Sequence, residues 1–442
     1  MLCNFNIKKT SLSLLYQIPK FLFSSRKPIL NNEDLKHFIE LNQTIQIDGI
    51  NLRANEIYPG PSIISRLNRI LKEASEKENS YLHETSIKRC LNAFDLNPND
   101  WEITFKEDSQ INTNISTIYS NIGKNGKIMC LNYYHGGNNP FGFEHLKDNI
   151  FINKLYEIEP QLGIVDMDKL SEEAKNFKPN LIFIGGNAYP RDWDYENFRK
   201  IKKQVNCLLM CDISQIYGLI STNLLKNPFN YCDIVTLGSN ILKNGIIFEK
   251  KKKNAIKKSI NQMILSKKQY FPNKEILSII SNQMLEIKSN RYKNFTKQII
   301  NNSKVLSEYL LNEGNRLQSN GTDTHLVLWD LKPLGINGSQ FKKTMSLVNI
   351  YLNRNSIAGD SNVKNPQGVL IGLYDATFRN IKEKDIEEIG RFLMNGCRIT
   401  QKYSHFHGDH YVKLIEGDKD IPLLKKKVLE FVKKFPIYES KI

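Results

Sequence analysis

The sequence predicts an α/β protein with a large, doubly wound, mostly parallel sheet and a smaller C-terminal α/β unit. Two short apolar runs, at 180–186 and 207–212, end in glycines or in aspartate and are typical of buried strands. The segment between them, 195–205, has helical spacing and a basic outer face. Strands separated by helices of this length form βαβ units, so the middle of the chain predicts a parallel sheet.

The remaining elements follow from the same periodicities. A further strand is expected from Cys232, and apolar residues recur every three or four positions from 274 to 311, which predicts helices. Apolar runs at 325–331 and 368–373 predict the strands of the smaller unit. Ligands of doubly wound sheets bind at the carboxyl ends of the strands, where Asp212 is expected to lie.

Composition limits the classes of function. A chain of 442 residues can hold two or three domains with a large buried core, and its apolar runs are too short to span a membrane. Its seven cysteines are scattered without a CxxC pair, which favours reduced thiols inside a cell over a disulfide framework. We therefore expect a soluble intracellular protein and no membrane partner.

The N-terminal segment 1–31 has the pattern of an organellar presequence, and we expect import into mitochondria. It carries five basic residues and no acid precedes Glu33, without a long hydrophobic core. A disordered tail is the alternative. Removing the segment lowers the formal net charge from +16 to +11 (16 − 5). Lysines 250–253, 257 and 258 predict a solvated face; without interleaved aromatic residues they do not predict a nucleic-acid partner.

Several stretches, in the right order, resemble the serine hydroxymethyltransferase family between about residues 38 and 394. The cofactor segment is 207–248, and the other matching stretches are 50–63, 90–103, 127–137, 156–201, 320–340 and 368–392. The resemblance implies the fold-type I, aspartate-aminotransferase-like fold of pyridoxal-phosphate-dependent transferases. It also implies dimers whose active sites lie at the subunit interface. We expect an N-terminal arm (32–61), a large domain (62–310) and a small C-terminal domain (311–442).

Residue by residue, the cofactor site that the resemblance implies is altered. Asp212 matches the carboxylate that keeps the pyridinium nitrogen protonated, but a family histidine is Gln215 and the histidine that stacks on the cofactor is Asn138. The family's His-Lys pair, whose lysine forms the Schiff base, falls on Asn240 and Ile241. Asn187 is a further position equivalent to the family's cofactor site.

The groups that hold anions in the family are replaced as well. The Ser-Gly-Ser phosphate cradle reads Gln110-Ile111-Asn112, whose bulk should obstruct the anion. The partner subunit's Gly-Gly-Pro loop corresponds to residues 274–276 or their neighbours, and the arginine that binds the substrate carboxylate corresponds to Leu370. The catalytic loop is shortened; Tyr81 survives in it, and His83 lies at the position of the acid–base glutamate, with Glu84 one place away.

Other residues keep a family identity or offer a replacement. Glu56, His135 and Arg379 are expected to make structural hydrogen bonds. Lys243 is the basic group that could take over the Schiff base; its alternative is an ordinary surface lysine. His405, His407, Asp409 and His410 spell a metallo-hydrolase motif, but its context is absent, so we predict no metal site there.

These replacements predict a protein of one-carbon metabolism with impaired catalysis. We expect a scaffold or regulatory subunit, as a homodimer or paired with an active hydroxymethyltransferase relative. The alternative is an active, divergent glycine hydroxymethyltransferase that binds pyridoxal phosphate on Lys243 and interconverts serine and glycine with tetrahydrofolate.

Overall fold

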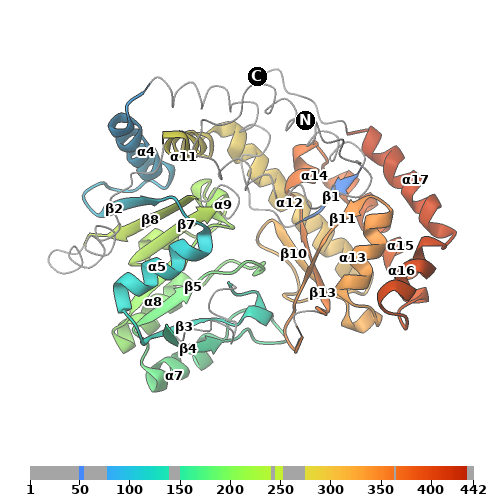
Figure 1. Cartoon of the computed structure of the whole chain (residues 1–442), viewed down its shortest axis with the longest axis horizontal. Helices are drawn as coiled ribbons and strands as arrows, with labels where there is room; N and C mark the ends of the chain where they lie inside the picture. Colours follow the sequence, from blue (N-terminus) through green and yellow to red (C-terminus); the bar gives the residue numbers. More distant parts are fainter. Residues whose placement is uncertain are drawn as a thin grey trace, which may run out of the picture.

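The computed structural model describes residues 49–53, 77–138, 150–239, 244–251, 274–362 and 365–435. These residues form a large sheet with its covering helices and a smaller sheet with its own, and the long helix α12 (Asn290–Asn312) runs between the two parts (Figure 1). The predicted presequence and the positions Glu56, Asn240 and Lys243 lie outside the described residues. Among the described segments, no helix has both the length and the apolar character that a membrane span requires.

The large sheet has seven strands in the order β2-β8-β7-β6-β5-β3-β4. Adjacent strands from β7 to β4 pair in parallel, whereas β8 is antiparallel to both of its neighbours. The strands are β2 (Trp101–Lys106), β3 (Gly126–Leu131), β4 (Phe151–Tyr156), β5 (Leu181–Ile184), β6 (Leu208–Asp212), β7 (Ile234–Ser239) and β8 (Asn244–Lys250). The predicted α/β class with a mostly parallel sheet is confirmed.

Helices cover both faces of this sheet, and alternate residues of its strands divide accordingly. Phe183 in β5 packs with Ile118 of helix α5, while its neighbours Ile182 and Ile184 belong to the core on the opposite face, with Phe198 of helix α8. The helices of this part are α4 (Asn79–Ala93), α5 (Gln110–Ile122), α7 (Met167–Phe177), α8 (Tyr195–Val205), α9 (Tyr217–Ser221) and α11 (Lys274–Glu286), with short 3-10 turns at Tyr133–His135 and Pro228–Asn230.

Two glycines let the first turns of α5 lie directly on the sheet. A Cβ atom at Gly238 in β7 would lie 2.8 Å from the Cα of Gln110, and one at Gly245 in β8 would lie 2.1 Å from the Thr113 hydroxyl. Both distances are shorter than side chains tolerate. The N-terminus of α5 is therefore held close to the carboxyl end of β6, where Asp212 lies.

The smaller part contains an antiparallel sheet in the order β12-β13-β10-β9. Its elements are β9 (Arg316–Leu317), β10 (Leu326–Asp330), η3 (Lys332–Leu334), α13 (Gly338–Leu347), β12 (Asn353–Asn355), β13 (Gly368–Gly372), α14 (Tyr374–Phe378), α15 (Glu383–Lys402), α16 (Gly408–Glu416) and α17 (Asp420–Lys433). Strand β1 (Ile50–Asn51) pairs in parallel with β11 (Ile350–Tyr351), so an early segment of the chain joins this part. The strands predicted around 325–331 and 368–373 are confirmed.

Candidate functional site

Asp212, at the end of β6, is the centre of a buried polar network. Its side chain is 5% exposed and accepts five hydrogen bonds. Oδ2 accepts from the side-chain amides of Gln110 at 2.7 Å, Asn114 at 2.7 Å and Asn138 at 2.9 Å. Oδ1 accepts from the backbone N–H of Ser214 at 2.9 Å and from the Ser214 hydroxyl. We call these five residues the Asp212 network.

The three amides come from two different elements. Gln110 and Asn114 lie one turn apart on α5, so their side chains leave the same face of the helix. Asn138 follows a tight turn after β3, in which Gly136 has φ +97° and a Cβ at Gly137 would lie 2.0 Å from a backbone oxygen. This turn brings the chain back across the ends of the strands, so that Asn138 faces Asp212.

A second layer fixes the orientation of the network. The Thr236 hydroxyl donates to Asn114 Oδ1 at 2.7 Å, so the NH2 group of Asn114 is the part that faces Asp212. The Ser214 hydroxyl accepts the backbone N–H of Gly238 at 2.8 Å. The orientations of Asn114 and Ser214 are therefore set by neighbouring groups of the protein, whereas Asn138 Oδ1 has no hydrogen-bond partner among the described residues.

The network leaves Asp212 without spare acceptor capacity. A carboxylate offers about four lone-pair positions, and this one already accepts five hydrogen bonds. A Cβ at Gly185 would lie 3.1 Å from both Asn138 Nδ2 and Asp212 Cβ, which shows that the packing around the carboxylate is close. A protonated ring nitrogen would have to displace one of the present donors. The observed arrangement therefore does not fit pyridoxal phosphate at this carboxylate.

The equivalent of the phosphate cradle is also engaged within the chain. Ser109 caps α5 by accepting the backbone N–H of Asn112 at 3.2 Å, and the Asn112 side chain donates to Asp108 at 2.7 Å. Gln110 is directed to Asp212. The helix N-terminus thus presents two bulky amides where the family has small residues. At the other loop predicted to face phosphate, residues 274–276 begin helix α11, and Ile276 is 1% exposed in the core.

Leu370, which corresponds to the family's carboxylate-binding arginine, lies in an apolar cluster. It is 4% exposed in β13 and packs with Leu326, Leu328, Ile357 and Ala188. Ala188 belongs to the loop that follows β5, so the cluster joins the two sheets. An anionic substrate group would meet aliphatic carbon there instead of a cationic partner.

His135 makes the structural hydrogen bond expected of it, whereas one nitrogen of the Arg379 guanidinium has no such bond among the described residues. His135 is 9% exposed and its Nδ1 accepts the backbone N–H of Ile158 at 3.1 Å, while burial lowers its pKa. Arg379 is 7% exposed, and burial lowers its pKa, although the nearby Asp375 carboxylate acts to raise it. Its Nη2 has no hydrogen-bond partner in the part of the chain that the structure describes. His135 therefore holds local structure, and neither residue is among the described hydrogen-bond donors to Asp212, which are Gln110, Asn114, Asn138 and Ser214.

The three residues predicted at the catalytic loop lie on α4, away from Asp212 in the same chain. Tyr81 is 52% exposed, and Glu84 pairs with Lys88 at 2.7 Å. The His83 ring packs edge-on against Phe105 with ring centroids 5.4 Å apart, and burial lowers the His83 pKa. Phe105 is in β2, three strands from β6 in the sheet order, or about 14 Å at the usual strand spacing.

The remaining predicted positions are not brought into one cluster. Gln215 and Asn187 are half-buried, and Asn187 Oδ1 lacks a hydrogen-bond partner among the described residues. His405, His407, Asp409 and His410 are exposed at the start of α16, where the His410 ring packs on Phe406 with centroids 4.8 Å apart. Across the described ranges, no three histidine, cysteine or carboxylate side chains are grouped as metal ligands would be.

Sequence reasoning missed Asn114, Ser214 and Thr236 as members of the site. The available signal was the spacing of Gln110 and Asn114, two amides one turn apart on the buried face of α5, which also carries Thr113 and Thr117. The family resemblance concerns positions of known function, and these three residues were missed because they lie outside those positions.

The fold and the position of Asp212 define the class, which is a fold-type I transferase of the pyridoxal-phosphate-dependent type. Residues 79–393 match the family model of serine hydroxymethyltransferase. A serine hydroxymethyltransferase of Plasmodium falciparum (isolate 3D7) is 33% identical over 431 residues, which cover 92% of this chain and 97% of the relative. Serine hydroxymethyltransferase 4 of Arabidopsis thaliana is 31% identical over 436 residues, covering 90% and 93%.

A serine hydroxymethyltransferase of Caenorhabditis elegans is 31% identical over 378 residues, which cover 79% of this chain and 75% of the relative. The chain therefore belongs to the serine hydroxymethyltransferase family, whose members are pyridoxal-phosphate-dependent transferases of one-carbon metabolism. The predicted family and fold are confirmed.

Proposed function

We propose that this chain is a catalytically impaired member of its family that acts as a scaffold or regulatory subunit. The observation that carries the proposal is the Asp212 network. In a pyridoxal enzyme the equivalent carboxylate keeps the ring nitrogen protonated and makes the cofactor an electron sink. Here the amides of Gln110 and Asn138, at two positions equivalent to cofactor-binding residues, hydrogen-bond to that carboxylate instead.

The closed network adds a free-energy cost to binding of the cofactor. A hydrogen bond to a charged group contributes about 1.5–3 kcal/mol, and three amides donate to one oxygen of Asp212. A cofactor would have to break at least one of these bonds and leave a buried amide without a partner. It would also lack the Schiff-base lysine at Ile241 and the arginine at Leu370.

The retained scaffold supports a role in assembly. The complete sheet, the helices on both faces and the small part are kept, although the groups for chemistry are replaced. By resemblance, family dimers build their active sites at the subunit interface. A chain of this kind can pair with an active relative and change its stability or activity, in mitochondria if the segment 1–31 directs import.

Borohydride trapping tests the loss of catalysis. The purified chain is mixed with pyridoxal phosphate, reduced and mapped by peptide mass spectrometry, with Lys243→Ala as the matched variant and an active family member as the positive control. We expect no stoichiometric adduct and no aldimine absorbance band. A single adduct on Lys243 that disappears in Lys243→Ala, together with serine cleavage, would establish the alternative, an active hydroxymethyltransferase.

Co-purification tests the scaffold role. The chain and an active hydroxymethyltransferase of the same organism are co-expressed with different tags, purified through both and sized by light scattering. We expect a mixed dimer whose specific activity differs from that of the active homodimer. Recovery of separate homodimers only, with unchanged activity after mixing, contradicts this role.

A further inference from the structure

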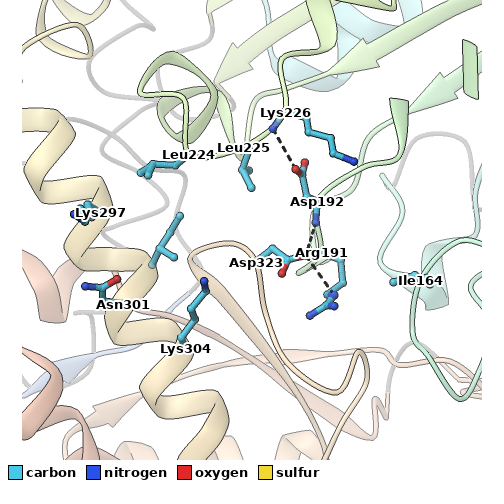
Figure 2. A pocket seen from close by; sticks show the side chains of 11 residues that line it. Ile164, Arg191, Asp192, Leu224, Leu225, Lys226, Lys297, Asn301, Lys304 and Asp323 are labelled. Atoms are coloured by element: carbon cyan, nitrogen blue, oxygen red, sulfur yellow. Dashed lines mark hydrogen bonds and ion pairs between the residues drawn. The ribbon is translucent and has the colours of Figure 1, made fainter. Parts of the chain in front are cut away.

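A cleft with a cationic lining opens on the side of α12. Its volume is about 620 Å3, within the range of small-molecule sites, which is ~300–1,000 Å3. The walls come from the loop after β5, the loop after α9, one face of α12 and the segment before β10 (Figure 2). No member of the Asp212 network lines it, so the cleft is separate from the site described above.

The two carboxylates of the cleft are engaged within the protein. Asp192 accepts the backbone N–H of Lys226 at 3.1 Å through Oδ2 and that of Trp193 at 2.9 Å through Oδ1. Asp323 Oδ2 accepts the backbone N–H of Asp192 at 3.0 Å and lies 3.4 Å from Arg191 Nε (Figure 2). These contacts hold the loops together and offset part of the positive charge.

The cations exceed the carboxylates. Arg191, Lys226, Lys297 and Lys304 carry four positive charges against two carboxylates, which leaves the lining at +2 (4 − 2). Within the part of the chain that the structure describes, the three lysines have no ion-pair partner. Lys297 and Lys304 are seven residues apart on α12, so their side chains leave the same face from Cα atoms about 10 Å apart along the axis.

The arginine of the cleft lies close to Gly321 and pairs with Asp323. Gly321 has φ +140°, and a Cβ atom added there would lie 3.2 Å from Arg191 Nη1. Arg191 Nε is buried, and among the described residues it lacks a hydrogen-bond partner. Aliphatic side chains, including Leu225 and Ile300, complete the walls between the cations. The cleft therefore combines a guanidinium paired with Asp323, three ammonium groups without an ion-pair partner among the described residues, and an apolar surface.

We propose that this cleft binds a small organic anion that carries at least two negative charges and an apolar segment. Phosphate esters and polycarboxylates share this chemistry. The lysines of α12 and Arg191 would hold the anionic ends, and Ile300 would contact the apolar part. Because the walls belong to the large part, α12 and the segment before β10, a bound anion connects them and stabilises the fold. This site does not depend on the proposed function.

Isothermal titration calorimetry on the full chain tests the site, with pyrophosphate and citrate as probes at low ionic strength. The test variant is Lys297→Gln/Lys304→Gln. The control is Lys293→Gln/Lys426→Gln, which removes the same charge from exposed helix positions outside the cleft. We expect saturable one-to-one binding of at least one probe to the wild type and the control, and an affinity at least about tenfold lower in the test variant.

The two probes distinguish the sources of the anion. Tighter binding of pyrophosphate assigns the cleft to phosphate esters, and tighter binding of citrate assigns it to polycarboxylates. Equal weakening in both double variants would show an effect of overall charge and overturn the proposal. Absence of saturable binding of both probes to the wild type would also overturn it. Circular dichroism confirms that both variants are folded before the comparison, as expected for exposed lysines.

Discussion

The substitution Asp212→Asn separates a structural carboxylate from a cofactor-binding one. An asparagine offers one acceptor oxygen and one NH2 group where aspartate offers two acceptor oxygens. If the oxygen turns toward Gln110, Asn114 and Asn138, the NH2 group faces the backbone N–H of Ser214. If the side chain turns the other way, its NH2 group faces three amide donors. Each orientation leaves buried donors unsatisfied.

The magnitude of the effect on stability follows from these contacts. One unsatisfied buried donor costs about 1–3 kcal/mol, and the remaining bonds lose the advantage of a charged acceptor, about 1 kcal/mol each. Asp212 is 5% exposed, so solvent cannot replace these partners. With one donor unsatisfied and the three amide bonds weakened, we expect Asp212→Asn to lower the free energy of unfolding by about 4–6 kcal/mol, without any added cofactor.

Urea unfolding followed by circular dichroism measures this effect. Asp168→Asn, an exposed aspartate in the first turn of α7, is the control and should change the free energy by less than ~1 kcal/mol. If Asp212→Asn unfolds within ~1 kcal/mol of the wild type, the carboxylate does not hold the three amides and the reasoning fails. A protein that uses Asp212 for its cofactor would instead lose the cofactor while its fold remained stable.

Three further predictions concern the neighbourhood of the site and the core. Leu370→Arg restores the family residue and places an unpaired charge in the apolar cluster, so it should lower the free energy of unfolding by about 3–5 kcal/mol in the same urea assay. We expect no serine cleavage by this variant. A variant as stable as the wild type contradicts the prediction. Gly238→Ala puts a methyl group 2.8 Å from the Cα of Gln110 and should lower the free energy of unfolding by about 1–3 kcal/mol. In Gly123→Ala the new Cβ meets nothing within 4 Å, so that variant isolates the cost of the positive φ at Gly123. His325 is fully buried without a partner for either ring nitrogen in the described residues, and burial lowers its pKa to about 3. The folded state favours the neutral ring, so the full free energy of unfolding is present above pH 6.5 and decreases as the pH falls toward 3, by up to ~1.4 kcal/mol per pH unit. The variant His325→Leu should flatten this dependence of the unfolding free energy on pH. An unchanged slope contradicts the assignment.

The α/β fold class could be predicted from the sequence because the patterns that indicate strands and helices are local. The run at 207–212 alternates with a helix of the expected length, and the strand that it forms ends at Asp212, as the structure confirms. The site depends on contacts that local patterns do not encode. Gln110 and Asn138 reach Asp212 across 102 and 74 positions of the chain, and only the folded backbone brings them to one oxygen.

The same limitation applies to the positions of Tyr81, His83 and Glu84 in the fold. Their sequence position matches a catalytic loop, but α4 places them beside β2, at the edge of the sheet. A pattern gives the order of residues along the chain and carries no information on which subunit a loop faces. Leu370 could be predicted as the loss of an arginine, whereas the cluster with Ala188 that replaces it required the position of both sheets.

The Asp212 network also explains why an aspartate persists beside altered chemistry. Taken one at a time, the residues at Gln110 and Asn138 read as losses of a phosphate cradle and of a stacking ring. In the structure both donate to Asp212, so each depends on the carboxylate for its hydrogen bond, and the carboxylate depends on them for its burial. A double-mutant cycle between Gln110→Ser and Asn138→His should therefore show a coupling of about 0.5–3 kcal/mol. Additive effects would mean that the two substitutions are independent losses, and Asp212 would then need another reason to remain.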